Sequence, residues 1–338
     1  MDRHQEDHAR EILEQYLSPL RDYLHDDSVQ EIMVNSHASV WIERRGQIAQ
    51  IDPQLDDTAI RAAIVLMGRI DNKDVRENTA DAIIDTRIHD MRVAAALHPT
   101  ALDGHSICIR KHLKVNLELD DYVEQMRLAK ESGEHRDIEP DHPRPDGEGL
   151  KEWLAWMVRS RKNFVVSGGT STGKTTFLNA LLSTIPADER VLTLEDVPEL
   201  NVKVPNRVRL ETNHQAGIDM RRLVKLALRY RPDRIVVGEV RGSETFDLLQ
   251  AMNSGHDGGC CSLHANNAAQ ALSKLETYVL TAETGWPLEA IRNQIGSTIE
   301  YVIQMGRTNG RRHIKEIIQV DGYDGHRYQT KTIFGGGH

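Results

Sequence analysis

The order of apolar and polar positions predicts two regions with different folds. In the first, apolar residues recur every three or four positions over 9–24, which predicts an amphipathic helix. A second helix begins near residues 56–57 and ends near residues 68–72. Short strand-like runs lie at 30–34, 40–43, 47–51, 91–96 and 105–110. We therefore predict a small α+β domain for the first third of the chain.

After residue 150 the pattern changes to apolar runs that alternate with helical patterns. The runs that predict strands lie at 163–166, 191–194 and 235–237, and a fourth ends at His264. The helical patterns lie near 174–184, 219–230, 243–254 and 268–281. Strands and helices that alternate in this way predict an α/β domain, in which helices cover both faces of a mostly parallel sheet.

The two regions are joined by a stretch that is poor in apolar residues. Ile138 is the one large apolar residue between positions 130 and 149. Such a stretch buries too little apolar surface to offset the entropy lost on ordering. We therefore expect an N-terminal domain over 1–113, a connecting segment over 114–150 and a second domain over 151–338.

Composition and charge exclude several classes of protein. The 338 residues carry 42 basic and 51 acidic side chains, a net charge of −9, which argues against a protein that coats DNA. The three cysteines, Cys108, Cys260 and Cys261, form no CxxC pair, so we expect neither a disulfide framework nor a cysteine zinc site. No apolar run of 18 residues and no signal-peptide pattern is present, so we expect a cytoplasmic protein.

A phosphate-binding loop is the strongest motif in the chain. The pattern G-x-x-x-x-G-K-[ST] is formed by Gly168, Gly169, Thr170, Ser171, Thr172, Gly173, Lys174 and Thr175. An apolar strand leads into it and a helical pattern leads out, which is the context that phosphate binding requires. We expect Lys174 to reach the β- and γ-phosphates and the Thr175 hydroxyl to bind Mg²⁺. The sequence therefore predicts a site for a nucleoside triphosphate.

Polar residues at the ends of three other predicted strands are candidates for the chemistry. Glu239 follows the run 235–237, where a carboxylate can orient or deprotonate a water molecule. Glu195 and Asp196 close the run 191–194 and can bind Mg²⁺ through water. His264 ends the fourth run, where a γ-phosphate sensor would lie, although a single His in an apolar run is more often a core residue.

The nucleotide is predicted to be ATP. Proteins specific for GTP usually carry Asn-Lys-x-Asp, and the nearest match here, residues 72–75, lacks the final Asp and lies in the other domain. The sixteen histidines show no H-E-x-x-H or comparable metal-ligand spacing.

Five motifs in order resemble those of the secretion ATPase superfamily, the hexameric motors of type II and type IV secretion. They lie at 168–176, 194–200, 228–234, 237–242 and 262–266, within a resemblance over roughly residues 80–306. The similarity is strongest to the conjugal-transfer (TrbB-like) branch. It implies a RecA-like ATPase domain after a PAS-like N-terminal domain, with Thr176 completing the phosphate loop and Mg²⁺ as cofactor.

The resemblance also implies roles for individual residues. Glu195 would act at the Mg²⁺ and water site, Glu239 in hydrolysis and His264 near the γ-phosphate. Arginines of the N-terminal domain reach the phosphates in this family, and Arg92 and Arg110 match those positions. Arg87 and Arg241 are weaker candidates.

The implied assembly is a homo-hexamer that works with secretion or conjugation channel proteins at the inner membrane. We expect a cytoplasmic location, at most peripheral to that membrane, and no sequence-specific nucleic-acid binding. The four-cysteine zinc module of the type II branch is absent, which favours type IV secretion or conjugation. The sequence does not distinguish conjugation from effector secretion, or a protein that powers a channel from one that assembles a pilus.

Two other functions share the fold. A RecA-like nucleic-acid translocase would need a basic channel with stacking aromatic residues, but aromatic residues make up only 5% of this acidic chain. A scaffold gated by nucleotide would not need the complete set of acid, lysine, histidine and arginine. Hydrolysis measured with and without single-stranded DNA separates these alternatives.

Overall fold

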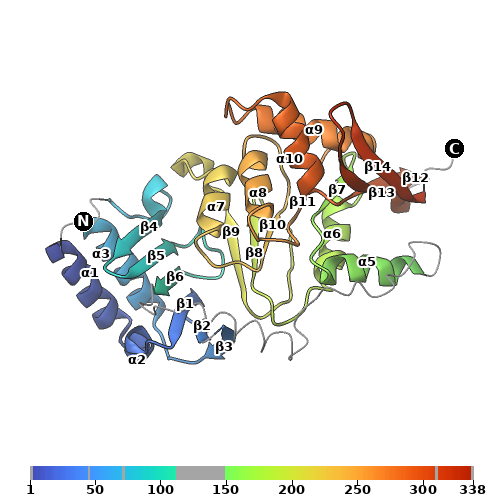
Figure 1. Ribbon diagram of the computed structural model, residues 1–338. Coiled ribbons are helices and arrows are strands. Elements are labelled where there is room, and N and C mark those ends of the chain that lie inside the picture. Colours follow the sequence, from blue (N-terminus) through green and yellow to red (C-terminus); the bar gives the residue numbers. More distant parts are fainter. Residues whose placement is uncertain (1–2, 45, 71–72, 112–148, 309–310, 336–338) are drawn as a thin grey trace, which may run out of the picture.

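The computed structural model describes residues 3–44, 46–70, 73–111, 149–308 and 311–335. Within these residues the chain forms two β-sheets that lie side by side, each with its own helices (Figure 1). The expected connecting segment, 114–150, falls almost wholly outside the described residues.

The N-terminal sheet has six antiparallel strands in the order β3-β2-β1-β6-β5-β4. Their bounds are β1 Val29–Ser36, β2 Ser39–Arg44, β3 Gln47–Ile51, β4 Ile83–Ile88, β5 Met91–Ala96 and β6 Ser106–Lys111. Helices α1 (Arg3–Tyr16) and α3 (Asp57–Ile70) pack against each other, and α1 also contacts β4. Leu13 of α1 and Ile60 of α3 are fully buried in the core, so the predicted α+β domain is confirmed.

The predicted continuous helix over 9–24 is wrong. The structure has α1, then a 3₁₀ turn at Ser18–Leu20, then the short helix α2 at Arg21–His25. Pro19 lies in the turn, where its ring and its missing N–H prevent an α-helix from continuing through it. Leu17, Leu20 and Leu24 are nevertheless buried, because the broken segment still packs on the sheet.

The second sheet has eight strands in the order β14-β13-β12-β7-β11-β10-β8-β9. The strands from β12 to β9 are parallel to their neighbours, and β13 and β14 are antiparallel additions. The bounds are β7 Phe164–Gly168, β8 Val191–Glu195, β9 Arg207–Glu211, β10 Arg234–Val237, β11 Cys260–Leu263, β12 Tyr301–Thr308, β13 Arg311–Tyr323 and β14 Tyr328–Gly335. The predicted parallel sheet is confirmed, although β9 and the last three strands were not predicted.

Helices cover both faces of this sheet (Figure 1). They are α5 Leu150–Arg159, α6 Lys174–Leu182, α7 Met220–Ala227, α8 Glu244–Met252, α9 Ala268–Leu280 and α10 Leu288–Thr298. In β7, Phe164 and Val166 pack with α5 and α6, whereas Val165 between them packs with the helices of the other face. This alternation shows why the first three positions of the strand are all apolar: each of its faces is buried.

The two sheets are joined through a partly polar contact. Arg190, which is fully buried, donates to Asn35 of β1 and to Asn206, and the Tyr230 hydroxyl lies 3.0 Å from the Ser106 hydroxyl of β6. The main chain takes part too, because Leu102 N donates to Arg209 O and Glu211 N donates to Thr100 O, both at 2.9 Å. One apolar cluster extends from the N-terminal sheet to the α7–α10 face of the second sheet.

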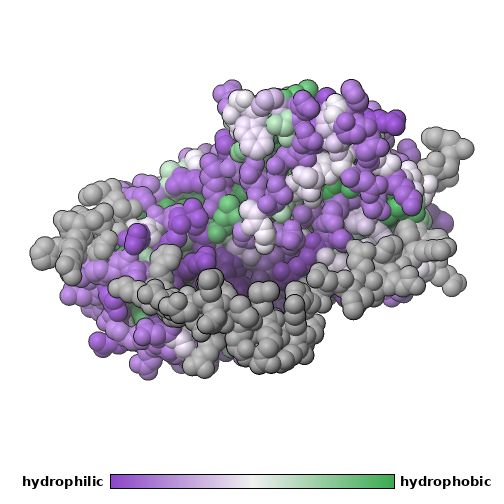
Figure 2. Space-filling view, viewed as in Figure 1, coloured by the Kyte–Doolittle hydropathy of each residue, from purple (hydrophilic) through white to green (hydrophobic). Residues whose placement is uncertain are grey.

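The visible surface is mainly hydrophilic (Figure 2), as expected when the apolar side chains are buried in the core. On the face shown in Figure 2, hydrophilic residues predominate and the hydrophobic ones form small separate spots. None of the helices in the described ranges has both the length and the apolar content needed to span a membrane.

Candidate functional site

The predicted phosphate loop connects β7 to α6. Gly168 is the last residue of β7, and a Cβ at that position would lie 2.9 Å from the Met305 carbonyl oxygen, so a side chain does not fit there. Gly173 has a φ of +87° and immediately precedes Lys174, the first residue of α6. That left-handed conformation suits glycine and lets the loop enter the helix directly. The helix N-terminus therefore faces the loop, as anion binding requires.

The remaining loop residues either hold the loop or are exposed. The Thr172 hydroxyl donates to the Gly169 carbonyl at 2.9 Å, which fixes the turn from within. Thr170, Ser171 and Thr176 are exposed, and Thr175 is partly exposed. These groups are accessible to a ligand.

Lys174 is the most buried charged group of the loop, with 8% of its surface exposed. Its Nζ lies 3.2 Å from the carbonyl oxygens of Gly168 and Gly169 and 3.3 Å from Nδ1 of His264. Burial lowers the pKa of Lys174, while the charge of Glu239 works in the opposite direction. The ammonium group thus lies at the loop and has partners that phosphate oxygens can replace.

The other predicted residues meet the loop because their strands are neighbours. Strands β7, β11, β10 and β8 are adjacent and parallel, so their carboxyl ends lie at one edge of the sheet. Glu195 ends β8, and Glu239 and His264 closely follow β10 and β11. A cavity of about 140 Å³ opens at this edge, lined by Thr175, Glu195, Asp196, Val197, Glu199, Gly238, Glu239 and Arg241.

Glu239 is held between two basic side chains. Its Oε2 accepts from Arg241 at 2.9 Å, and its Oε1 lies 3.1 Å from Nε2 of His264. Burial alone would raise the pKa of Glu239, but the hydrogen bond and charge of Arg241, with smaller contributions from His264 and Lys174, lower it below its ordinary value. The side chain therefore stays ionised in this site.

Glu195 is buried, and its two oxygens differ. Oε1 accepts from the backbone N–H groups of Glu199 and Leu200, both at 2.8 Å, whereas Oε2 is buried with no hydrogen-bond partner. Burial raises the pKa of Glu195, although the two backbone N–H groups oppose that effect. Glu195 and Thr175 line the same cavity, and a carboxylate oxygen without a partner there fits a Mg²⁺ ion that keeps most of its waters.

Arg92 and Arg110 lie away from the loop in this chain. They are direct neighbours across β5 and β6, and Arg92 is also the direct partner of Arg87 on β4. Arg92 donates to Asp85 at 3.1 Å, and Arg110 lies 3.6 Å from Glu31. Their proposed action on phosphates stays a prediction, and within one chain the structure shows these ion pairs instead.

Arg241, a weaker candidate from the sequence, and Glu244, which was not predicted, both contribute to the site. Arg241 joins Glu239 to Asp196, whose Oδ2 lies 3.5 Å from the Arg241 guanidinium. Glu244, in the first turn of α8, accepts from the N–H groups of Arg241 and Gly242 and so fixes that loop. An acidic residue directly after a serine N-cap is favoured by the positive end of the helix dipole, and this local signal could have pointed to Glu244.

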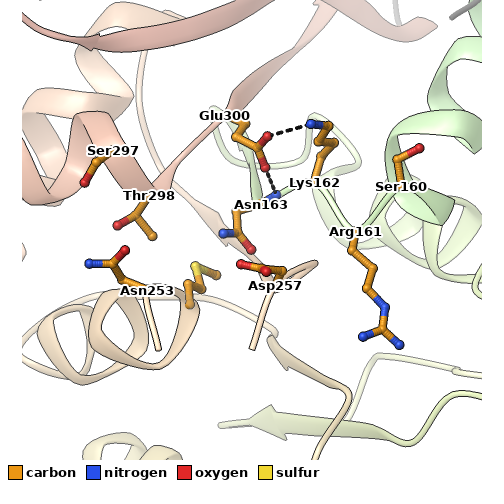
Figure 3. A pocket seen from close by; sticks show the side chains of 10 residues that line it. Ser160, Arg161, Lys162, Asn163, Asn253, Asp257, Ser297, Thr298 and Glu300 are labelled. Carbon is orange, nitrogen blue, oxygen red and sulfur yellow. Dashed lines mark hydrogen bonds and ion pairs between the residues drawn. The ribbon is translucent and has the colours of Figure 1, made fainter. Parts of the chain in front are cut away.

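A second polar cavity, of about 400 Å³, lies at the opposite edge of the sheet (Figure 3). It adjoins the residues that precede β7 and β12, and the Glu300 carboxylate there accepts from Asn163 N at 2.9 Å and pairs with Lys162 at 3.0 Å. Ligands of parallel α/β sheets bind at the carboxyl ends of the strands. The cavity beside the phosphate loop is therefore the candidate active site.

Comparisons with known proteins show what the whole chain is similar to. A family model described as "Type II/IV secretion system protein" matches residues 14–330. The conjugal transfer protein TrbB of Rhizobium radiobacter is 32% identical over 311 residues, which cover 91% of this chain and 88% of that protein. The type IV secretion system protein VirB11 of Bartonella henselae is 28% identical, with 95% and 94% covered. The crystal structure of the VirB11 ATPase from the Brucella suis type IV secretion system, in complex with sulphate, superposes with a TM-score of 0.79 at 26% identity, covering 92% of this chain and 96% of that one.

Proposed function

This chain belongs to the type II/IV secretion system protein family, and from that premise we propose that it is an ATPase that powers type IV secretion or conjugal transfer. The family expected from the sequence motifs is thereby confirmed. The observation that carries the proposal is the convergence of Lys174, Glu239 and His264 at the phosphate loop, with each contact between them at 3.3 Å or less. A lysine for the phosphates and a carboxylate for water are the groups that hydrolysis needs.

Each side chain then has a distinct role. The N–H groups of the loop and the ammonium of Lys174 bind the β- and γ-phosphates, taking the place of the carbonyl contacts that Lys174 makes here. Glu239, kept ionised by Arg241, orients a water molecule and accepts its proton during attack on the γ-phosphorus. His264 lies between these two groups and would contact the γ-phosphate.

Thr175 and Glu195 are the residues that would hold Mg²⁺. The ion would neutralise charge on the phosphate oxygens during transfer. Glu195 would contribute Oε2, which is buried and has no hydrogen-bond partner. A divalent cation beside this carboxylate would favour its ionised form. In the part of the chain that the structure describes, no group of three His, Cys, Asp or Glu side chains could hold a metal ion. Mg²⁺ usually keeps several waters and binds through one or two protein oxygens and phosphates, so the nucleotide and water would complete the coordination.

In this proposal, ATP hydrolysis drives a motion of one sheet relative to the other. Contacts with the γ-phosphate and Mg²⁺ hold a closed arrangement in many nucleotide-driven machines, and hydrolysis releases it. We place the moving boundary between the N-terminal domain, 1–113, and the ATPase domain, 151–338. Family membership supports a homo-hexamer, in which Arg92 and Arg110 of one copy can approach a nucleotide.

The partners are proposed to be channel proteins of a secretion or conjugation machine. The chain would act in the cytoplasm, at the inner face of the inner membrane. The similarity to a conjugal transfer protein and to a type IV secretion system protein supports this assignment. The net charge of −9 argues against a protein that coats nucleic acid.

A single-turnover hydrolysis assay tests the proposal. Purified full-length protein is mixed with a limiting amount of labelled ATP and with Mg²⁺, with and without single-stranded DNA, and the particle mass is measured in the same buffer. We expect phosphate release that DNA does not accelerate, from a particle with the mass of six chains. No release of phosphate would reject the ATPase assignment, and release only with DNA would favour a translocase.

A further inference from the structure

The β12–β13 hairpin flanks the phosphate loop on the side away from His264. Strand β7, which leads into the loop, lies between β11 and β12. Met305 of β12 is paired in register with Gly168. The end of the hairpin beyond Met305 is rich in cations, with Arg307 on β12 and Arg311 and Arg312 on β13.

Arg312 packs against the loop itself. A Cβ placed on Gly173 would lie 2.7 Å from Cδ of Arg312 and 3.5 Å from its Nε. Gly173 precedes Lys174, so the stem of the arginine covers the point where the loop enters α6. A cationic head group is thus held next to the backbone that is built to bind phosphate.

Arg307 is the direct cross-strand partner of Arg312. Directly paired residues point to the same face of a sheet, and two like charges in that position destabilise it. Both side chains are exposed, and among the described residues neither guanidinium has a carboxylate within 4.0 Å. An anion bound between the two arginines would remove the repulsion.

We propose that Arg307 and Arg312 bind phosphate groups of the nucleotide held by the phosphate loop of the same chain. Guanidinium groups bind phosphate oxygens through paired N–H donors, with a geometry that lysine cannot reproduce. The nucleotide would then be held from the hairpin as well as from Lys174. The inference rests on the proposed function, because it assigns two further residues to the same ATP site.

Substitutions at neighbouring positions of β13 test the assignment. The affinity for a fluorescent ADP or ATP analogue is measured for the wild type and for Arg312→Gln, Arg312→Lys and Arg311→Gln. Arg311 is the matched control, because adjacent residues of a strand point to opposite faces. We expect Arg312→Gln to weaken binding about tenfold or more, a loss typical of a hydrogen bond to a charged group. Arg312→Lys should recover part of the affinity, and Arg311→Gln should bind like the wild type.

Thermal unfolding of Arg307→Gln separates ligand binding from a structural role. Removing one of two opposed cations should raise the melting temperature without nucleotide and should reduce the increase in melting temperature that ATP causes. A purely structural role would lower the melting temperature without nucleotide. That result would overturn the proposal.

Lys174→Ala distinguishes the failure of this inference from the failure of the proposed function. If Lys174→Ala loses nucleotide binding while Arg312→Gln and Arg307→Gln bind like the wild type, the arginine assignment is wrong and the ATP site stands. If Lys174→Ala binds nucleotide at wild-type affinity, the proposed function itself is wrong. Inorganic phosphate alone is the last probe: a thermal shift by phosphate that Arg312→Gln removes, with nucleotide affinity unchanged, would assign the arginines to a separate anion site and overturn the proposal.

Discussion

The His264 imidazole lies against the Glu239 carboxylate, with Nε2 3.1 Å from Oε1. Its other nitrogen, Nδ1, lies 3.3 Å from Lys174 Nζ. An ammonium group can only donate, so Nδ1 accepts from Lys174, and the proton of the neutral ring is then on Nε2, which faces Glu239. The group that we propose for phosphate binding is thereby linked through one ring to the group that we propose for orienting water.

Glu239→Gln should separate binding from hydrolysis. The amide keeps the size of the side chain and can still accept from Arg241, but it cannot accept a proton from water. We expect nucleotide affinity close to the wild type and a turnover lower by about 10²- to 10⁴-fold. Phosphate release and equilibrium binding are measured on the same preparation, with the exposed Glu289→Gln of α10 as control. A wild-type rate in Glu239→Gln would show that another residue activates the water.

Glu195→Gln should alter the requirement for Mg²⁺. The substituted side chain keeps one oxygen for the N–H groups of Glu199 and Leu200 but loses the negative charge. We expect the Mg²⁺ concentration for half-maximal hydrolysis to rise roughly ten- to a hundredfold, in the range seen when groups that support a metal site are removed. Titration of activity against Mg²⁺ measures this. Glu211→Gln, at the paired position of β9, should leave the titration unchanged.

Arg241→Gln should shift the acid limb of the pH profile. Arg241 lowers the pKa of Glu239 by a hydrogen bond and by its charge, so the wild-type carboxylate stays ionised at a lower pH than an ordinary glutamate does. Without Arg241 the pKa rises, and a larger fraction of Glu239 is protonated at mildly acidic pH. The acid limb of kcat/KM should therefore move to higher pH. An acid limb in the same place, whatever the change in rate, would contradict this account of Glu239.

Glu31→Gln should stabilise the protein at neutral and higher pH. Burial raises the pKa of Glu31 to about 7, although the charge of Arg110 opposes it. The folded state therefore holds a proton that the unfolded state loses near pH 4.5, so this group lowers the free energy of unfolding as pH rises from about 4.5 to 7. At pH 8 we expect Glu31→Gln to be more stable by roughly 1–3 kcal/mol. Urea unfolding at pH 4.5 and pH 8 measures the difference, which should nearly vanish at the lower pH.

The Tyr230–Ser106 pair should contribute to the joint between the sheets. The two hydroxyl groups lie 3.0 Å apart and are buried, and the Tyr230 hydroxyl also donates to the Ser106 carbonyl. We expect Tyr230→Phe to lower the free energy of unfolding by about 1 kcal/mol. A double-mutant cycle with Ser106→Ala should give a coupling energy of similar size. Additive losses would show that the hydroxyl groups contribute independently.

The candidate site was predictable because its signals are local. The loop at 168–175 and the polar residues that follow apolar strands can be recognised from spacing alone, and parallel strands bring their carboxyl ends together. Each of Lys174, Glu195, Glu239 and His264 lies at the predicted edge of the sheet. What these side chains do in catalysis remains a prediction.

The rest depended on partners far away in the sequence. The motif at 228–234 was recognised, but the structure shows that it supplies the joint: Arg229 pairs with Asp85, Tyr230 with Ser106 and Arg231 with Glu43. These partners are more than 120 residues away, so no local pattern identifies them. Strand β13 was missed because one half of it is largely exposed and carries charged residues, which hides its period of two.

The main-chain joint at the edge of the second sheet limits how the two sheets can separate. Strand β9 is an edge strand, and residues 100–102 are bonded to it through backbone atoms, with Ala101 bridged to Leu210. Backbone bonds do not depend on which side chains are present, so most substitutions leave this attachment intact. During a nucleotide cycle this short segment would act as a pivot about which the N-terminal sheet turns while it remains attached. Residues 100–102 also cover part of the edge of β9, so that another chain cannot pair with it there. This reduces the risk of aggregation through strand pairing.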